Sequence, residues 1–104
     1  MRVLDHPEVG EIRLESVLHA LADPIRLQIV RFLAQAARGV SCSEIELEVS
    51  KSTGTHHYRV LREAGVISQV YRGTAKFNAL RRDDLDTLFP GLLDSVVSAI
   101  AARR

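Results

Sequence analysis

Apolar positions in the first part of the chain recur at helical spacing. Within residues 8–22 they share one helix face: Leu14, Val17, Leu18 and Leu21. Asp23-Pro24 is typical of an N-cap followed by proline at the first helical position, so a second helix is predicted over residues 24–37. We expect Gly39 to end it. The apolar face of this second helix comprises Ile25, Ile29, Phe32, Leu33 and Ala36.

A short and a long helix are predicted in the middle of the chain. Ser43 and Glu46 have the spacing of a capping box, which predicts a short helix from Ser43 to about residue 47 or 48. The longer helix covers residues 51–64. Ser50 and Ser52 can accept hydrogen bonds from its first turn, and Gly65 lies where a left-handed C-cap belongs. One face of this helix is an apolar stripe made of Gly54, Tyr58 and Leu61.

The last third of the chain predicts a hairpin and then a broken helix. Residues 66–71 and 74–80 are rich in β-forming side chains, with Arg72-Gly73 as the expected tip. A helical region starts at Asp83 or Asp84 and should break at Pro90-Gly91. An apolar stripe then continues to residue 102 through Leu92, Leu93, Val96, Val97 and Ile100. The predicted fold is a mostly helical α+β domain over residues 1–104. Residues 43–65 form a helix-turn-helix, and residues 66–80 form a β-hairpin wing.

The second face of the helix over residues 51–64 carries hydrogen-bond donors. They recur at helical spacing and none is acidic: Ser52, Thr55, His56 and Arg59. Serine and threonine suit phosphates or base edges, and arginine suits guanine or phosphate. A polar face is usually only solvated, but solvated faces normally mix both charge signs. We therefore expect this helix to enter the major groove of DNA.

Charge is distributed unevenly along the chain. The formal net charge is +1, yet residues 51–82 contain seven basic residues and one acid, a local balance of +6. Such a zone is an electrostatic footprint for a polyanion. Within it, Lys51 and Thr53 are expected to hold phosphates. Arg72 is either a wing contact to phosphate or minor groove, or an exposed turn cation, and the basic zone favours the wing contact.

Composition excludes several other classes. A chain of 104 residues allows one domain, and two Tyr, three Phe and no Trp argue against an aromatic platform for single-stranded nucleic acid. No apolar run approaches the roughly 20 residues that span a membrane. The N-terminus lacks the apolar region of a signal peptide, and the single Cys excludes an internal disulfide. We expect a cytoplasmic protein.

Three segments together resemble the ArsR/SmtB family of bacterial transcriptional repressors. They are LADPIRLQIVRFL, KSTGTHHYRVLREAGVI and YRGTAKFNALRRDDL, and the resemblance extends over about residues 17–93. The Asp-Pro-x-Arg-Leu element at residues 23–27 and the HHYRVLREAG element are specific when they occur together at this spacing. The resemblance implies a homodimer that binds double-stranded operator DNA and releases it when an unidentified small-molecule inducer or an oxidant acts.

The chain departs from the family at the positions that hold metal. Many members carry two cysteines in the third helix, whereas residues 40–49 here contain only Cys42, and no His follows His57. One thiolate cannot form the three- or four-ligand site that zinc prefers, so we expect no metal and no cofactor. The region before Ser50 is also about two residues shorter than the usual helix and turn. We therefore expect a stunted or irregular third helix.

Cys42 and His57 each have two interpretations. Cys42 is a partly buried small residue near a helix start, or a redox-sensing thiol whose pKa is lowered by the helix N-terminus; we favour the first. His57 lies at i+3 from Gly54 and i−4 from Leu61, so it should border the core. A Cys42–His57 metal pair would have too few ligands.

The apolar stripes near both ends of the chain contain more apolar residues than the core of so small a domain can bury. Residues 8–22 and 83–102 are therefore predicted to form a dimer interface. The main hypothesis is a homodimeric repressor that binds a palindromic operator. The alternative is a winged-helix module that binds protein and no DNA, which would require an acidic or apolar recognition face. Catalysis has little support, because no third group is evident to orient a Cys–His pair.

Overall fold

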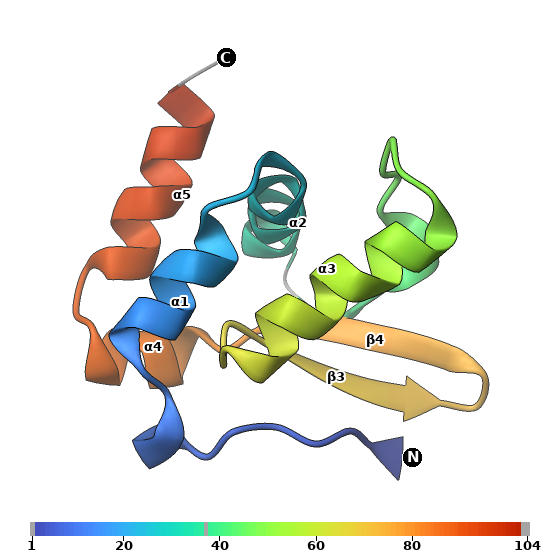
Figure 1. Cartoon of the computed structure of the whole chain (residues 1–104), viewed down its shortest axis with the longest axis horizontal. Helices are drawn as coiled ribbons and strands as arrows, with labels where there is room; N and C mark the ends of the chain where they lie inside the picture. The colour runs from blue at the N-terminus through green and yellow to red at the C-terminus, as the bar shows by residue number, and fades with distance from the viewer. Residues whose placement is uncertain (1, 37, 103–104) are drawn as a thin grey trace.

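The computed structural model describes residues 2–36 and 38–102. These residues form five helices, two short 3-10 turns, two long strands and two strands of two residues (Figure 1). In chain order the elements are β1 (Arg2–Val3), η1 (Val9–Glu11), α1 (Leu14–Leu21), α2 (Pro24–Gln35), β2 (Val40–Ser41), η2 (Cys42–Glu44), α3 (Lys51–Glu63), β3 (Ile67–Arg72), β4 (Ala75–Leu80), α4 (Arg82–Leu88) and α5 (Leu92–Ala102). The predicted mostly helical α+β architecture with a hairpin wing is confirmed.

The strands form one antiparallel sheet in the order β1-β3-β4-β2. The long hairpin pairs Ile67 with Leu80 at its base and Arg72 with Ala75 at its end. Gly73 and Thr74 therefore form the turn, and Gly73 has φ +65°. The predicted tip at Arg72-Gly73 is wrong by one residue, because Gly73 has to take the first of the two turn positions, where a positive φ is needed.

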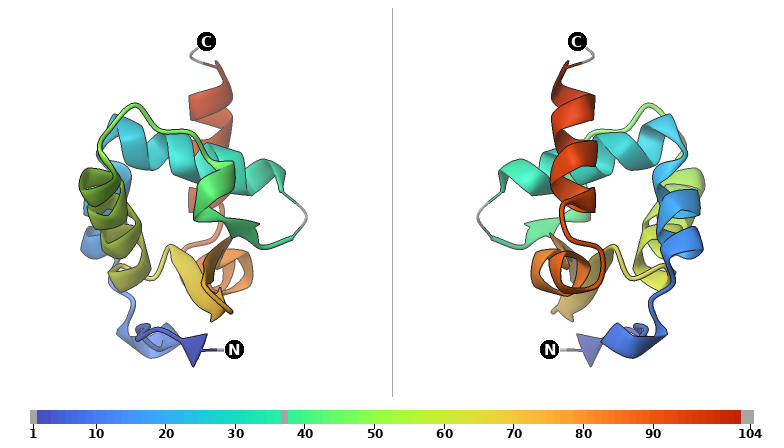
Figure 2. Two further views of the ribbon diagram at one scale, coloured as in Figure 1. Left: turned by 90° about the vertical axis from the view of Figure 1, so that its right-hand side faces the viewer. Right: turned by 90° about the vertical axis from the view of Figure 1, so that its left-hand side faces the viewer.

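The core lies where α1, α2 and α3 meet the base of the hairpin. These three helices contact one another, and α3 packs on β3. The largest fully buried side chains come from these elements and from α4, which contributes Leu85: Ile29, Leu61, Ile67, Leu85, Gln69, Val17, Val30, Val66 and Asn78. Figures 1 and 2 show the hairpin projecting away from the helices, with α3 running beside it. The arrangement presents one side of α3 and the wing on the same part of the molecule.

The ends of α3 are fixed by its own sequence. The Ser50 side chain accepts from the Thr53 N–H at 3.2 Å, which confirms Ser50 as the N-cap. At the other end Gly65 has φ +88°, its N–H donates to the Arg62 carbonyl, and the Val66 N–H donates to the Leu61 carbonyl. This pair of bonds is a Schellman motif, so the predicted glycine C-cap is confirmed.

The segment before α3 is shorter than an ordinary helix. Only the 3-10 turn η2 forms, which confirms the expected stunted third helix. Its capping box joins Ser41 and Glu44, so the predicted box of Ser43 with Glu46 is wrong. Both pairs have the same spacing, and Ser41 prevails because β2 pairs with β4 and fixes where the turn begins.

The remaining helices differ from expectation mainly at their ends. Residues 8–22 form η1 and α1 rather than one helix, and α2 ends at Gln35. Residue 37, the predicted end of that helix, lies outside the described residues. The predicted break at Pro90-Gly91 is present, between α4 and α5, which bend by 113°. Within the described residues no single helix is long and apolar enough to cross a membrane; only the bent pair α4 and α5 passes that test together.

Candidate nucleic-acid interface

The predicted donor face of α3 lies open to solvent. Ser52, Thr55, His56 and Arg59 are all exposed and lie away from the buried stripe of Gly54, Tyr58 and Leu61. Lys51 and Thr53, at the start of the helix, are exposed as well, and Lys51 lies at the edge of that stripe, beside Gly54 and Tyr58. The only acid on α3, Glu63, lies in its last turn. The exposed surface over the first three turns of α3 therefore carries six of the seven residues predicted to bind DNA, and no carboxylate.

Hydrogen bonds within α3 orient part of this face. The Thr55 hydroxyl donates to the Lys51 carbonyl at 2.9 Å, which leaves its oxygen free to accept. Arg59 Nη2 lies 3.4 Å from His56 Nδ1, so these two side chains lean together one turn apart. The Ser50 hydroxyl donates to Thr53 Oγ1 at 2.9 Å. Thr53 therefore belongs to the helix cap as well as to the exposed surface.

The wing adds two cations beside aromatic rings. Arg72 is exposed at the end of β3, and its guanidinium carbon lies 5.1 Å from the centre of the Phe77 ring. Lys76 Nζ lies 5.4 Å from the centre of the Tyr71 ring. These distances fit cation–π contacts, which hold the charges near the hairpin surface. Lys76 was counted in the basic zone but was not predicted as a site residue.

Three of the seven cations in the basic zone serve the fold. Arg62 Nη1 donates to Gln69 Oε1 at 2.8 Å. Arg81 pairs with Asp84 and donates to the Pro7 carbonyl, and Arg82 donates to the Ala34 carbonyl. The remaining four lie on α3 and the wing: Lys51, Arg59, Arg72 and Lys76. The cations left for binding a polyanion are thus fewer than the sequence suggested, and they lie on α3 and the hairpin.

A buried polar chain links α3 to η2 through the sheet. Gln69 accepts from Arg62 and donates through Nε2 to Asn78 Oδ1 at 2.7 Å. Asn78 Nδ2 donates to the Val40 carbonyl and to Cys42 Sγ, each at 3.1 Å. Cys42 is half-buried at the start of η2, as the favoured interpretation predicts. Sequence spacing gave no sign of this chain, because its members are far apart in sequence and alternate with apolar strand residues.

A second buried cluster joins α2 to α3. Arg26 is buried; its Nη1 lies 3.1 Å from His57 Nδ1, and its other nitrogens donate to the Ala20 and His19 carbonyls. His57 borders the core, as predicted. Burial opposes ionisation of Asp23, but the Arg26 and Ile25 N–H groups and nearby positive charge together lower its pKa. Arg26 was missed, because an arginine inside an amphipathic helix usually faces solvent.

Metal ligands do not gather in the described part of the chain. Within residues 2–36 and 38–102, no three His, Cys, Asp or Glu side chains lie close enough to hold an ion. His56 and His57 rings are 5.7 Å apart, but they point to different environments, one exposed and one buried. The expectation of a metal-free protein stays a prediction.

Comparisons with known proteins identify relatives in sequence and in fold. A helix-turn-helix domain model matches residues 21–70. YceK of Bacillus subtilis, an uncharacterized HTH-type transcriptional regulator, is 33% identical over 82 residues, covering 77% of this chain and 82% of YceK. MJ1325 of Methanocaldococcus jannaschii carries the same description and is 34% identical over 62 residues, covering 59% and 70% of the two chains.

Two crystal structures share the fold. An ArsR family transcriptional regulator superposes with a TM-score of 0.66 at 19% identity, over 88% of this chain and 98% of its own. Rv0081 of M. tuberculosis superposes with a TM-score of 0.59 at 24% identity, over 93% and 97% of the two chains. At these identities the likeness concerns the fold alone, and it confirms the predicted winged helix.

Proposed function

This chain belongs to the helix-turn-helix transcriptional regulators, and from that premise we propose that it is an ArsR-like homodimeric repressor of a palindromic operator. The observation that carries the proposal is the exposed face of α3, which has donors on three turns and no carboxylate among them. A helix with such a face fits the major groove, where base edges present acceptors.

The residues divide into those that read bases and those that hold the backbone. Ser52, Thr55, His56 and Arg59 share one exposed face of α3 and are assigned to base edges. Lys51 and Thr53, at the helix start, and Arg72, at the end of β3, are assigned to phosphates. Arginine, lysine and helix N-termini are among the groups that commonly contact DNA phosphates, which supports the second assignment.

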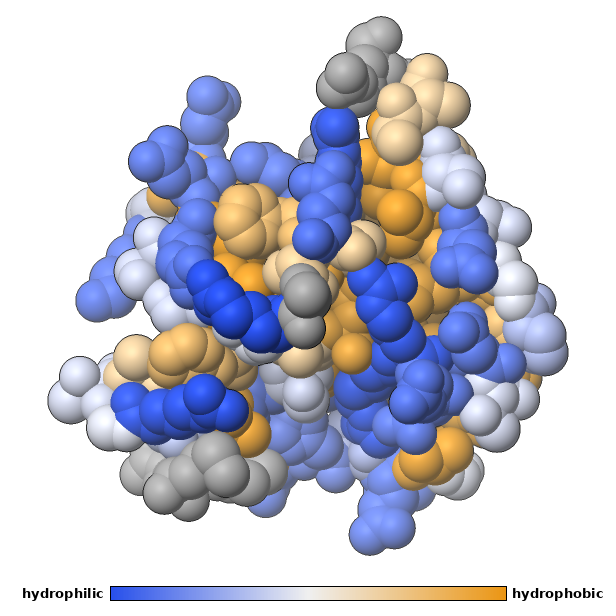
Figure 3. All heavy atoms as spheres, turned by 180° about the vertical axis from the view of Figure 1, so that it is seen from behind, coloured by the Kyte–Doolittle hydropathy of each residue, from blue (hydrophilic) through white to orange (hydrophobic). Residues whose placement is uncertain are grey.

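Apolar surface at both ends of the chain supports the dimer. Leu14 and Leu18 are 44% and 48% exposed on adjacent turns of α1. On α5 only Leu93 is buried, while the other members of the predicted stripe stay half-exposed: Leu92, Val96, Val97 and Ile100. Figure 3 shows apolar surface gathered along α5. A second copy would cover this surface, and a palindromic operator would then meet two α3 helices roughly 34–36 Å apart.

Two measurements test the repressor proposal, and a third tests the metal-free expectation. Light scattering should give a dimer at micromolar concentration, and a monomer would overturn the assembly. A gel shift against genomic fragments should select a palindrome, with affinity that falls steeply as salt rises, because phosphate binding releases counterions. If no fragment binds at low salt, the repressor proposal fails and the protein-interaction alternative is favoured. Elemental analysis of protein purified without chelator should find substoichiometric metal, and one ion per subunit would contradict the metal-free expectation.

A further inference from the structure

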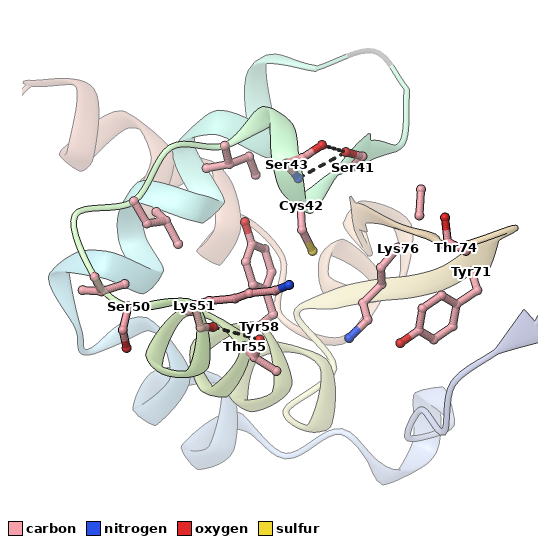
Figure 4. Close-up of a pocket in the computed structure, with 15 residues that line it drawn as sticks. Ser41, Cys42, Ser43, Ser50, Lys51, Thr55, Tyr58, Tyr71, Thr74 and Lys76 are labelled. Carbon is pink, nitrogen blue, oxygen red and sulfur yellow. Dashed lines mark hydrogen bonds between the residues drawn. The ribbon is translucent and has the colours of Figure 1, made fainter.

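A cavity of about 800 Å³ separates the start of α3 from η2 and the hairpin (Figure 4). Its volume falls in the range of roughly 300–1,000 Å³ that is typical of small-molecule sites. It exists because η2 is a single turn, followed by the irregular segment 45–50, so no full helix packs against this part of α3. The aliphatic part of its wall comprises Ile45, Leu47, Val49 and Ala75.

Tyr58 lines this cavity, and its hydroxyl is closed off from solvent and has no partner among the described residues. Tyr58 is only 5% exposed, and its hydroxyl oxygen is buried and makes no hydrogen bond there. Burial raises the pKa of Tyr58, so the phenol stays protonated and offers a donor. A buried hydroxyl without a partner costs about 1–3 kcal/mol, which an acceptor placed in the cavity would relieve.

The charges around the cavity have one sign. Two of the lining residues are lysines, Lys51 from α3 and Lys76 from β4, and none of the described lining residues is acidic. Figure 4 shows both lysine side chains turned toward the space between α3 and the hairpin. The wall therefore combines aliphatic surface, a buried phenol donor and two ammonium groups.

We propose that this cavity binds a small organic anion with an apolar body, such as an aromatic carboxylate. The body packs on Ile45, Leu47 and Val49, an acceptor atom takes the Tyr58 hydroxyl, and the anionic group lies near Lys51 and Lys76. A DNA phosphate does not satisfy the same site, because the duplex holds it at the surface, whereas the Tyr58 hydroxyl lies beneath the surface.

Occupation of the cavity opposes DNA binding. Lys51 and Thr55 line the cavity and also belong to the exposed face of α3. An anion that engages Lys51 withdraws a cation assigned to a phosphate. This consequence rests on the proposed function, while the binding of the anion does not.

The test uses 8-anilinonaphthalene-1-sulfonate, a fluorescent aromatic anion, together with the single cysteine. Cys42 lines the cavity and is the only Cys in the chain, so iodoacetamide reports on this site alone. We expect one probe per subunit and at least a fivefold slower alkylation of Cys42 when the probe is saturating. Binding that leaves the alkylation rate unchanged would overturn the proposal, and so would the absence of saturable binding.

Two variants and a control locate the bound probe. Tyr58→Phe and Lys76→Gln should each weaken probe binding about three- to tenfold. Phe32→Ser alters apolar surface outside the cavity, where Phe32 is 39% exposed, and should leave the affinity unchanged. Binding lost in Phe32→Ser but kept in Tyr58→Phe would place the probe elsewhere and overturn the proposal. In a separate experiment, saturating probe should release operator DNA from the wild-type protein; if no DNA binds without probe, the repressor proposal fails while the cavity result stands.

Discussion

The two halves of α3 are supported very differently. The C-terminal half is held by a Schellman motif, by the buried Leu61 side chain and by the bond from Arg62 to Gln69. The N-terminal half has a side-chain cap at Ser50, but behind it lies the cavity left by the short η2 turn. Most of the donors assigned to DNA lie on this thinly supported half. The well-supported C-terminal half of α3 thus continues into an N-terminal half that borders the cavity.

The largest expected effect is a difference in stability between alanine variants of two leucines, one in the C-terminal half of α3 and one beside its N-terminal half. Leu61→Ala should lower the free energy of unfolding by about 2–5 kcal/mol, because Leu61 is 0% exposed in close-packed surroundings. Leu47→Ala should cost at most about 1 kcal/mol, since Leu47 lines the cavity and is partly exposed. Urea denaturation measures both. Equal losses would mean that the two halves are equally well packed.

Gly54 within α3 and Gly65 just after its end should respond to alanine with opposite signs. Gly65→Ala should destabilise the protein by about 1–3 kcal/mol, because φ is +88° and the new Cβ would lie 2.6 Å from Ile12 Cγ1. Gly54→Ala should stabilise it by about 0.5–1 kcal/mol, since Gly54 has ordinary space toward Leu47 and alanine is the better helix former. Thermal melts of the pair test this. If the Gly54→Ala protein is less stable than the wild type, the N-terminal half of α3 is too closely packed to accept a Cβ at this position.

The outer surface of α3 should differ from the wing in what it contributes to DNA binding. Arg59→Ala should cost about 1–3 kcal/mol on the operator and flatten discrimination at one base pair per half-site. Arg72→Ala should weaken all sequences similarly and lower the salt slope by about one for each lost phosphate contact. Affinities of the two variants for operator and scrambled DNA, measured at several salt concentrations, distinguish the two roles. If Arg59→Ala lowers both affinities equally, Arg59 holds phosphate and the assigned reading face is wrong.

The smallest effect concerns pH and the support of the C-terminal half. Gln69, which holds Arg62, also donates its backbone N–H to His6 Nε2 at 2.9 Å. Burial lowers the pKa of His6, and the charges of Arg81 and Arg62 add to that shift. The folded protein therefore favours neutral His6, whose contribution is present above about pH 6.5 and is lost as the pH falls through the lower folded value.

The expected loss between pH 7 and 5 is a few tenths of a kcal/mol, because the ring is only partly buried. His6→Gln should flatten this part of the stability profile, as followed by urea denaturation at each pH. His19→Gln, at an exposed position on α1, is the matched control and should leave the profile unchanged. A profile that stays steep in His6→Gln would assign the titration to another group.

Local chemistry made part of this structure predictable. Asp23-Pro24, Ser50 and Gly65 were placed correctly because a cap depends on residues within one turn. The donor face of α3 followed from helical spacing, and its residues are all exposed, although their contacts with DNA stay predictions.

Other features depend on contacts between distant residues. Asn78 meets Cys42 only after β2 pairs with β4, and Arg26 meets His57 only after α2 packs on α3. The box of Ser41 with Glu44 prevailed over that of Ser43 with Glu46 for the same reason. Neither the spacing of residues along the chain nor their helix and strand propensities indicate which distant residues meet. The sequence therefore did not predict the buried polar chain or the cavity beside α3.

The strand order β1-β3-β4-β2 has a consequence for behaviour at high concentration. The two long strands lie inside the sheet, and each outer position is occupied by a strand of only two residues. Long open sheet edges are templates for pairing between molecules, and short ones are poor templates. Removing the first eight residues would uncover the outer side of β3 at Val70 and Tyr71, where β1 pairs, and would free the Gln69 N–H that donates to His6. Such a truncated protein should aggregate through its wing before it loses its fold.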